Sequence, residues 1–187
     1  MEKTKNNATL GAVLVGLKLL LICAIIAGLV SFVYAVTADV YAENLKGTKE
    51  AAVGSIFGKD GRLPYTELKK TESATVSAVY DGESLLGYCV EVKTAGFGGD
   101  IELMIGYNTD GSIRGVNVVS HSETPGLGSK SADAAHLDQY KGTSGALTAD
   151  EDIDMIAGAS VTSKAVLAGV NLANAALAEV LGTGGAK

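Results

Sequence analysis

The segment from Asp154 to Ser163 reads D-M-I-A-G-A-S-V-T-S and holds three hydroxyl side chains where an apolar, strand-like run meets a long helical pattern. The small residues 157–159 would let a ligand approach the backbone closely. The helix expected over residues 162–181 would offer unpaired N–H groups and the positive end of its dipole, which together favour a phosphate. A hydroxyl at this point, Ser160 above all, could bind a phosphate or be esterified by one.

Ser160 also has a purely structural interpretation. A serine where a strand passes into a helix is a good N-cap, and Ser163 could extend the cap. For an isolated segment of small residues followed by serine, this structural role is the commoner one. The functional interpretation therefore depends on a second motif elsewhere in the chain.

That second motif is the loop from His121 to Lys130, H-S-E-T-P-G-L-G-S-K, which follows an expected strand. Pro125 fixes its own φ and restricts Thr124 to extended geometry. The glycines on either side of Leu127 permit positive φ, so the loop turns sharply and pushes Leu127 outward. An apolar side chain flanked by Thr and Glu could lie on the face of a flat ligand, although an ordinary structural turn is the alternative.

Alternating apolar and polar residues predict the strands that must position these two segments. The expected strands are 75–80, 85–94, 101–107 and 113–120. They form an antiparallel meander of about four strands, one face of which must be covered by helices, with 162–181 as the obvious cover. The predicted fold class is therefore α+β: an antiparallel sheet covered by helices, with one N-terminal transmembrane helix.

An uncharged apolar run of 18 residues extends from Leu19 to Val36. As a helix it would be about 27 Å long, close to the hydrocarbon thickness of a bilayer. Lysines precede the run and Asp39 and Glu43 follow it, which places the N-terminus in the cytoplasm and the rest of the chain outside. A cleaved signal peptide is the alternative, because residues 36–38 resemble a cleavage site, but the run is longer than the usual signal-peptide core.

Composition excludes several classes of protein. The formal net charge is −6 at pH 7, and the acidic excess lies after the apolar run, which argues against binding of nucleic acid. Two cysteines and two histidines, all well separated, predict neither a disulfide framework nor a metal site. We divide the chain into a cytoplasmic N-terminus (1–9), a transmembrane helix (10–37), a stalk helix and linker (38–64), an extracytoplasmic domain (65–182) and a tail (183–187).

Three motifs together, F-G-G-D-I (97–101), the loop 121–130 and D-x-x-A-G-A-S-x-T-S (154–163), resemble the periplasmic-type FMN-binding domain. The resemblance is strongest to the G subunit of the Rnf ion-translocating electron-transport complex. The C subunit of the sodium-pumping NADH:quinone oxidoreductase is a relative. The resemblance covers nearly the whole chain, including the single N-terminal anchor.

The resemblance implies that FMN is bound covalently. In that family the last motif usually reads D-x-x-S-G-A-T-x-T-S, and the Thr after Gly-Ala carries FMN as a phosphoester made by a dedicated flavin transferase. Aligned here, the acceptor is Ser160, a serine in place of the usual threonine, and Ala157 replaces the usual serine. Thr162 matches the second threonine of the motif and is the fallback acceptor.

The resemblance also implies that the loop 121–130 packs against the isoalloxazine, with Glu123, Thr124 and Leu127 as the contacts. No residue is expected to act as acid, base or nucleophile in turnover. The expected cofactor-binding residues are Ser160 as covalent acceptor, with Asp154, Gly158, Ala159, Thr162, Ser163, Glu123, Thr124, Gly126, Leu127, Gly128 and His121.

The implied function is electron transfer by covalent FMN within an Rnf-type complex of the cytoplasmic membrane, which links ferredoxin and NAD to Na⁺ or H⁺ transport. The expected partners are the other membrane subunits, the flavin transferase and the lipid bilayer. The alternatives are the C subunit of a sodium-pumping quinone reductase, which is generally longer, a stand-alone anchored extracytoplasmic flavoprotein reductase, and an anchored domain that binds a phosphorylated ligand non-covalently.

Overall fold

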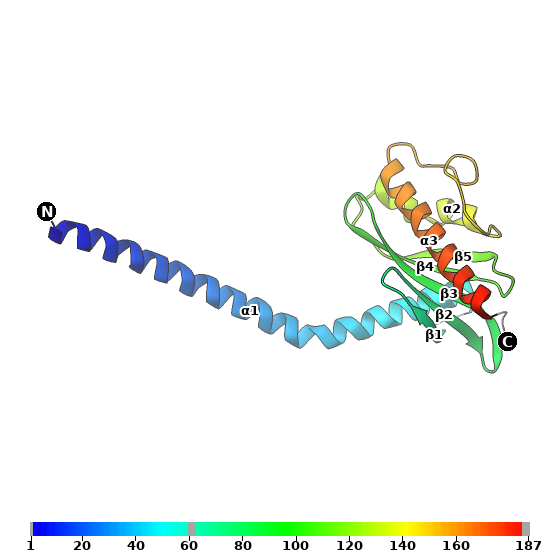
Figure 1. The fold of residues 1–187 in the computed structure, drawn as a ribbon, viewed down its shortest axis with the longest axis horizontal. Coiled ribbons are helices and arrows are strands. Elements are labelled where there is room, and N and C mark those ends of the chain that lie inside the picture. Colours follow the sequence, from blue (N-terminus) through cyan, green and yellow to red (C-terminus); the bar gives the residue numbers. More distant parts are fainter. Residues whose placement is uncertain (1, 60–62, 185–187) are drawn as a thin grey trace. The chain divides into compact units, whose positions relative to one another are not determined.

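The computed structural model describes residues 2–59 and 63–184, with side chains described from Val13 to Gly182 outside the gap. Backbone contacts divide the chain into two units, residues 1–45 and 46–187, and each is taken by itself. Part of the predicted linker (60–62) and most of the predicted tail (185–187) lie outside the described residues. The fold class is confirmed: a five-stranded antiparallel sheet with helices, and a long apolar helix at the N-terminus (Figure 1).

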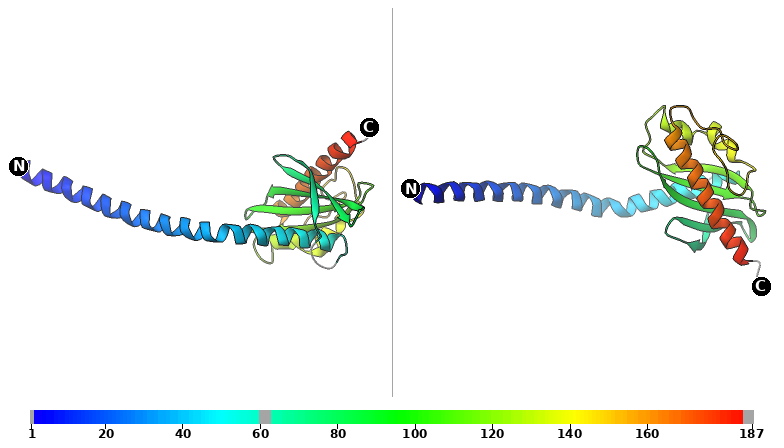
Figure 2. Two further views of the ribbon diagram at one scale, coloured as in Figure 1. Left: turned by 90° about the horizontal axis from the view of Figure 1, so that it is seen from below. Right: turned by 45° about the horizontal axis from the view of Figure 1, so that its top comes forward.

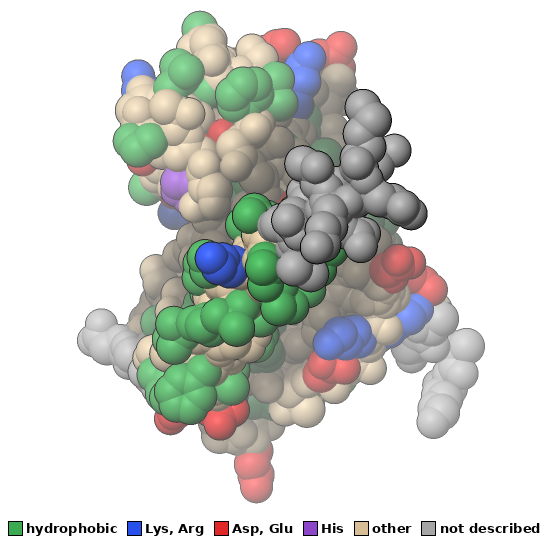
Figure 3. All heavy atoms as spheres, turned by 90° about the vertical axis from the view of Figure 1, so that its left-hand side faces the viewer, with side chains coloured by type: hydrophobic (Ala, Val, Ile, Leu, Met, Phe, Trp, Pro, Cys, Tyr) green, Lys and Arg blue, Asp and Glu red, His purple; other side chains and the backbone are tan. Residues whose placement is uncertain are grey.

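Helix α1 (Glu2–Ile56) contains both the predicted transmembrane helix and the predicted stalk, and it continues through Gly47 without a break. Its large apolar side chains between Val13 and Val36 are exposed, and hydrophobic side chains make up most of the helix surface seen from its N-terminal side (Figure 3). A helix that is apolar on all sides and of this length has the properties of a membrane span.

The sheet is a meander in which each strand pairs with the next along the chain. Its strands are β1 (Tyr65–Lys70), β2 (Ala74–Asp81), β3 (Ser84–Ala95), β4 (Asp100–Tyr107) and β5 (Ile113–Ser120). The four expected strands correspond to β2–β5. Strand β1, Y-T-E-L-K-K, was not predicted because it has too few apolar residues to show an alternating pattern. It forms as an edge strand, where only one side needs a partner.

Alternate residues of the strands supply two cores on the two faces of the sheet, as the strand period of two requires. On β3, Val90 and Val92 belong to the larger core, which packs against helix α3 (Ser160–Gly184). Cys89 faces the other way and belongs to a smaller core with Val53 and Phe57, from the end of α1 and the turn after it. Figure 2 shows α3 lying across its face of the sheet.

The segment before α3 corrects one prediction. The apolar run that ends at Ile156 is not a strand; only Ile153 forms an isolated bridge, with Ala149. Ile153 is fully buried in the larger core, so its apolar character serves packing. Between β5 and this segment lie three short helices, η1 (Gly128–Ala132), α2 (Ala134–Leu137) and η2 (Asp138–Tyr140).

Helix α3 packs closely on the sheet at Gly169, and this contact generates a prediction. A Cβ there would lie 2.5 Å from Leu103 Cδ1 and 3.1 Å from Thr94 Cγ2. Gly169→Val should therefore lower the free energy of unfolding by about 1–3 kcal/mol through overpacking, measured by urea titration of the full chain in mild detergent. The matched control is Gly182→Val, because nothing lies within 4 Å of a Cβ at that position. Equal stability of the two variants would contradict this packing.

Candidate functional site

A cleft of about 280 Å³ lies where three segments meet: the β3–β4 loop, the loop after β5 and the first turn of α3. Its lining residues are Phe97, Glu123, Thr124, Leu127, Gly128, Gly158, Ala159, Ser160, Val161 and Thr162. The two motifs of the sequence, far apart along the chain, therefore line one cleft. This volume is just below the roughly 300–1,000 Å³ of small-ligand pockets, so a larger ligand would lie partly in solvent.

Ser160 is the first residue of α3, and its side chain is exposed in the cleft. The residue before the helix is Ala159, whose carbonyl accepts the first helical hydrogen bond from the Ser163 N–H at 2.9 Å. The structural interpretation of Ser160 as the N-cap is therefore wrong, because the helix begins two residues earlier than the pattern predicted. Within the described part of the chain, the Ser160 hydroxyl has no hydrogen-bond partner.

The backbone at the start of α3 is also available to a ligand. In the described ranges, the N–H groups of residues 160–162 have no acceptor, as expected for the first turn of a helix. Gly158 has a φ of +82°, in the region that favours glycine, and turns the chain into the helix. Exposed N–H groups at a helix start, with the helix dipole behind them, attract an anion.

The carboxylate of Glu123 forms the back of the cleft and is only 6% exposed. Its Oε2 accepts a hydrogen bond from the Thr162 hydroxyl at 2.7 Å, and its Oε1 accepts one from the Gly98 N–H at 3.0 Å. One side chain therefore joins all three segments of the cleft. The resemblance implied that Glu123 contacts the ligand; in the structure its carboxylate also ties the cleft walls together.

Burial alone would raise the pKa of Glu123. The hydrogen bonds from Thr162, Gly98 and Phe97, together with the nearby His121, outweigh burial and hold the pKa below its ordinary value. The carboxyl group is therefore ionised at neutral pH. Gly128 makes room for it, since a Cβ there would lie 2.5 Å from Glu123 Oε2 and 3.1 Å from Thr162 Oγ1.

Apolar side chains surround the mouth of the cleft. Phe97 is 76% exposed, Val161 57% and Leu127 47%. Large apolar side chains in such exposed positions at one opening are typical of a binding surface for an apolar group. Phe97, Val161 and the backbone of Gly98 were not among the predicted site residues; the signal for Phe97 was a lone aromatic residue in a run of glycines.

Four expected residues do not line the cleft. His121 supports the loop, with its Nδ1 accepting a hydrogen bond from the Glu123 N–H at 3.2 Å. Gly126, with a φ of +75°, lies at the exposed turn. Ser163 is buried, and its hydroxyl donates to the Ala159 carbonyl at 3.1 Å. Asp154 lines a separate hollow beside His136.

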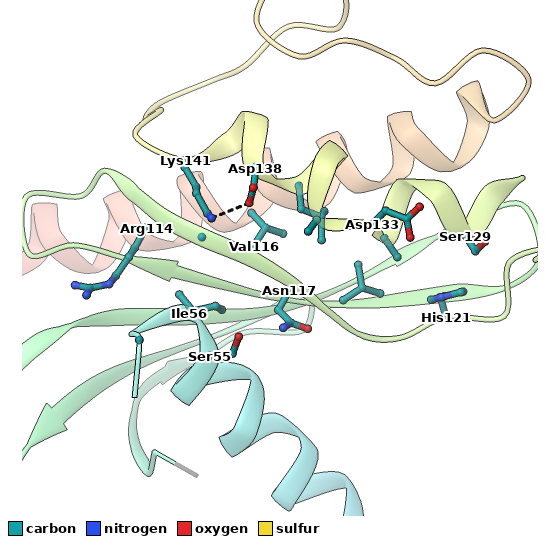
Figure 4. A pocket seen from close by; sticks show the side chains of 16 residues that line it. Ser55, Ile56, Arg114, Val116, Asn117, His121, Ser129, Asp133, Asp138 and Lys141 are labelled. Atoms are coloured by element: carbon teal, nitrogen blue, oxygen red, sulfur yellow. Dashed lines mark ion pairs between the residues drawn. The ribbon is translucent and has the colours of Figure 1, made fainter. Parts of the chain in front are cut away.

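A larger groove of about 760 Å³ runs along β5, between the end of α1 and the short helices (Figure 4). Of the expected site residues, only His121 lines it. Its side chains are mixed in charge, and Lys141 is paired with Asp138 at 2.7 Å. Neither Ser160 nor Thr162 lines this groove, so it lacks the first turn of α3 that distinguishes the smaller cleft.

The model of the FMN-binding domain family matches residues 96–175. This range contains every residue that lines the smaller cleft. The matched range covers strands β4 and β5, the cleft and the first part of α3, and this part of the chain is similar to the FMN-binding domain family.

The chain is also homologous to G subunits of ion-translocating oxidoreductase complexes, which confirms the resemblance seen in the motifs. It is 31% identical over 138 residues to the G subunit of the Na⁺-translocating ferredoxin:NAD⁺ oxidoreductase complex of Acetobacterium woodii, covering 66% of each chain. It is 37% identical over 100 residues to the G subunit of the proton-translocating complex of Clostridium ljungdahlii, covering 50% of this chain and 54% of that one.

The matched region thus spans between about half and two thirds of the length of these two relatives. Among solved structures, the crystal structure of Shewanella oneidensis NqrC matches with a TM-score of 0.46 and 24% identity, over 58% of this chain and 62% of that one.

The depressed pKa of Glu123 generates a prediction with a definite sign. Its hydrogen bonds contribute stability that is fully present above the ordinary glutamate pKa of 4.5 and is lost as the pH falls through the lower folded-state value. The free energy of unfolding should therefore fall below about pH 4.5 more steeply in the wild type than in Glu123→Gln. Denaturant titrations of the full chain between pH 7 and pH 3 measure this. If the free energy of unfolding falls equally steeply below pH 4.5 in the two proteins, Glu123 does not make these stabilising hydrogen bonds.

Proposed function

We propose that the chain is an electron-transfer subunit that carries FMN in a membrane complex coupling electron transfer between ferredoxin and NAD to Na⁺ or H⁺ transport. One observation carries the proposal: the cleft that joins the two predicted motifs lies wholly inside the matched FMN-binding domain. The named relatives are subunits of complexes that translocate Na⁺ or protons and act on ferredoxin and NAD⁺. The other subunits of such a complex are the proposed partners.

The residues of the cleft fit the two ends of FMN. The free N–H groups at the start of α3 and the Ser160 hydroxyl suit the phosphate, while Leu127 and Phe97 offer apolar surface to the isoalloxazine. Bound FMN supplies the electron-carrying chemistry. The chain itself holds the phosphate, orients the ring and shields part of it from water.

We further propose that Ser160 carries FMN as a covalent phosphoester. Two hydroxyls of the motif line the cleft, and their surroundings differ. Thr162 is 3% exposed, and its hydroxyl donates to Glu123. Ser160 is exposed and its hydroxyl is unengaged within the described residues, so it is the one that a transferase can reach.

In the attachment step, the Ser160 oxygen forms a bond to the phosphorus of the flavin phosphate and loses its proton. The bond that breaks is the phosphoanhydride of an activated flavin dinucleotide bound by the transferase, and a nucleoside monophosphate leaves. The ester keeps the flavin at the site outside the cell, where a dissociated cofactor would be lost by dilution.

The proposed location is the cytoplasmic membrane, with a single span. Residues 1–9 would be cytoplasmic, residues 10–37 would cross the bilayer, and the FMN-binding domain, 65–182, would be extracytoplasmic. The exposed apolar side chains of α1 and the lysines before the apolar run support this arrangement. A retained anchor also keeps the flavin close to membrane partners.

The attachment proposal predicts the mass of the full chain after co-expression with a flavin transferase. The wild type should gain the mass of one FMN phosphoester, Ser160→Thr should keep it, and Ser160→Ala should lose it. Thr162→Ser, which preserves the second hydroxyl, is the matched control and should keep the increment. Intact mass spectrometry with peptide mapping measures all four. An increment that persists in Ser160→Ala and maps to Thr162 would contradict the assignment of the acceptor, and no increment in the wild type would contradict covalent attachment.

A further inference from the structure

Glu123 is a buried carboxylate that lines the cleft and has no ion-pair partner among the described residues. None of the ion pairs within the described residues includes it. Both of its oxygen atoms accept hydrogen bonds from neutral donors, the Thr162 hydroxyl and the Gly98 N–H. Neutral donors stabilise a carboxylate without cancelling its charge, so a net negative charge remains at the back of the cleft.

The surroundings of this carboxylate screen its charge poorly. A hollow of about 10 Å³ also borders Glu123, and its lining includes the apolar Ile101, Val118 and Val166 and the polar His121, Ser131 and Thr162. A hollow needs roughly 10–15 Å³ to hold one water molecule. His121 lies near this carboxylate, and its Nδ1 accepts a hydrogen bond from the Glu123 backbone N–H at 3.2 Å.

We infer that Glu123 is a positioning residue that also tunes the redox potential of the flavin: its buried, unpaired negative charge beside the cleft lowers the reduction potential of the bound FMN. The inference rests on the proposed function, because it concerns FMN held in this cleft. Reduction adds negative charge to the ring system. A fixed anion nearby therefore destabilises the reduced form, and it does so more strongly where water does not reach.

The position of Glu123 makes this effect specific. The domain is acidic overall, but exposed carboxylates act through solvent and are screened within about 10 Å at ordinary salt. Glu123 is instead 6% exposed and lines the cleft itself. The same carboxylate joins the cleft walls through its hydrogen bonds and places a negative charge beside the ligand. Substitutions that remove the charge and substitutions that only weaken the hydrogen bonds separate these two roles.

The test is the midpoint potential of FMN on the full-length, flavin-loaded chain in detergent, measured by spectroelectrochemistry at pH 7. In Glu123→Gln, which removes the charge, the potential should rise, so that the ratio of reduced to oxidised flavin at a fixed potential increases about tenfold or more. Glu123→Asp keeps the charge but shortens the side chain; its potential should stay near that of the wild type even though the hydrogen bonds are weakened.

The matched control is Glu72→Gln, which makes the same change of charge at an exposed residue in the β1–β2 turn and should leave the potential unchanged. A potential that is unchanged or lower in Glu123→Gln would overturn the inference. A rise of equal size in Glu123→Asp would also overturn it, because the effect would then come from the hydrogen bonds. These outcomes are read on loaded protein, so they are distinct from a failure of FMN attachment, which intact mass shows beforehand.

Discussion

The hydrogen bonds of one buried carboxylate hold the functional cleft together. Glu123 reaches from the loop after β5 to Thr162 at the start of α3 and to the backbone of Gly98 in the β3–β4 loop. Three segments that are remote in sequence thereby share a fixed arrangement around one opening. The glycine at position 128 is part of the same constraint, since a side chain there would occupy the space of the carboxylate.

The scaffold behind the cleft is rigid for ordinary reasons of packing. The larger core joins β3 and β4 to α3, and residues such as Ile105 and Val170 are fully buried in it. Because α3 is packed along its length, its first turn is fixed too. The free N–H groups of that turn and the Ser160 hydroxyl are therefore held in one position at the cleft. The mouth, by contrast, keeps Phe97 and Val161 in solvent, a cost in exposed apolar surface that a bound flat ring would offset.

The sequence was enough to predict four of the five strands, and the family resemblance suggested that the two motifs share one site. Strands β2–β5 alternate clearly between apolar and polar residues, so their period was visible, whereas β1 was hidden by its charged residues. The start of α3 was placed too late because small residues and hydroxyls at 157–160 carry no periodicity. The apolar Ile153 was interpreted as part of a strand, although it serves the core as a single buried side chain.

The candidate site was harder to predict for a different reason. Motif resemblance brought the right loops together, but only three-dimensional contacts separate residues that face the cleft from those that support it. His121, Ser163 and Gly126 act through hydrogen bonds and turns beside the cleft, and no pattern in the sequence distinguishes them from Leu127 or Ser160. Phe97 lies beside Gly98, whose N–H donates to Glu123, and this contact between positions 25 residues apart could not be read from the sequence.

The most direct test is a structure of the full-length, flavin-loaded protein at a resolution that shows the cofactor. We expect continuous density from the Ser160 oxygen to the FMN phosphate, with the isoalloxazine between Leu127 and Phe97. An isoalloxazine lying in the groove along β5, or a phosphate joined to any other residue, would contradict the proposed site.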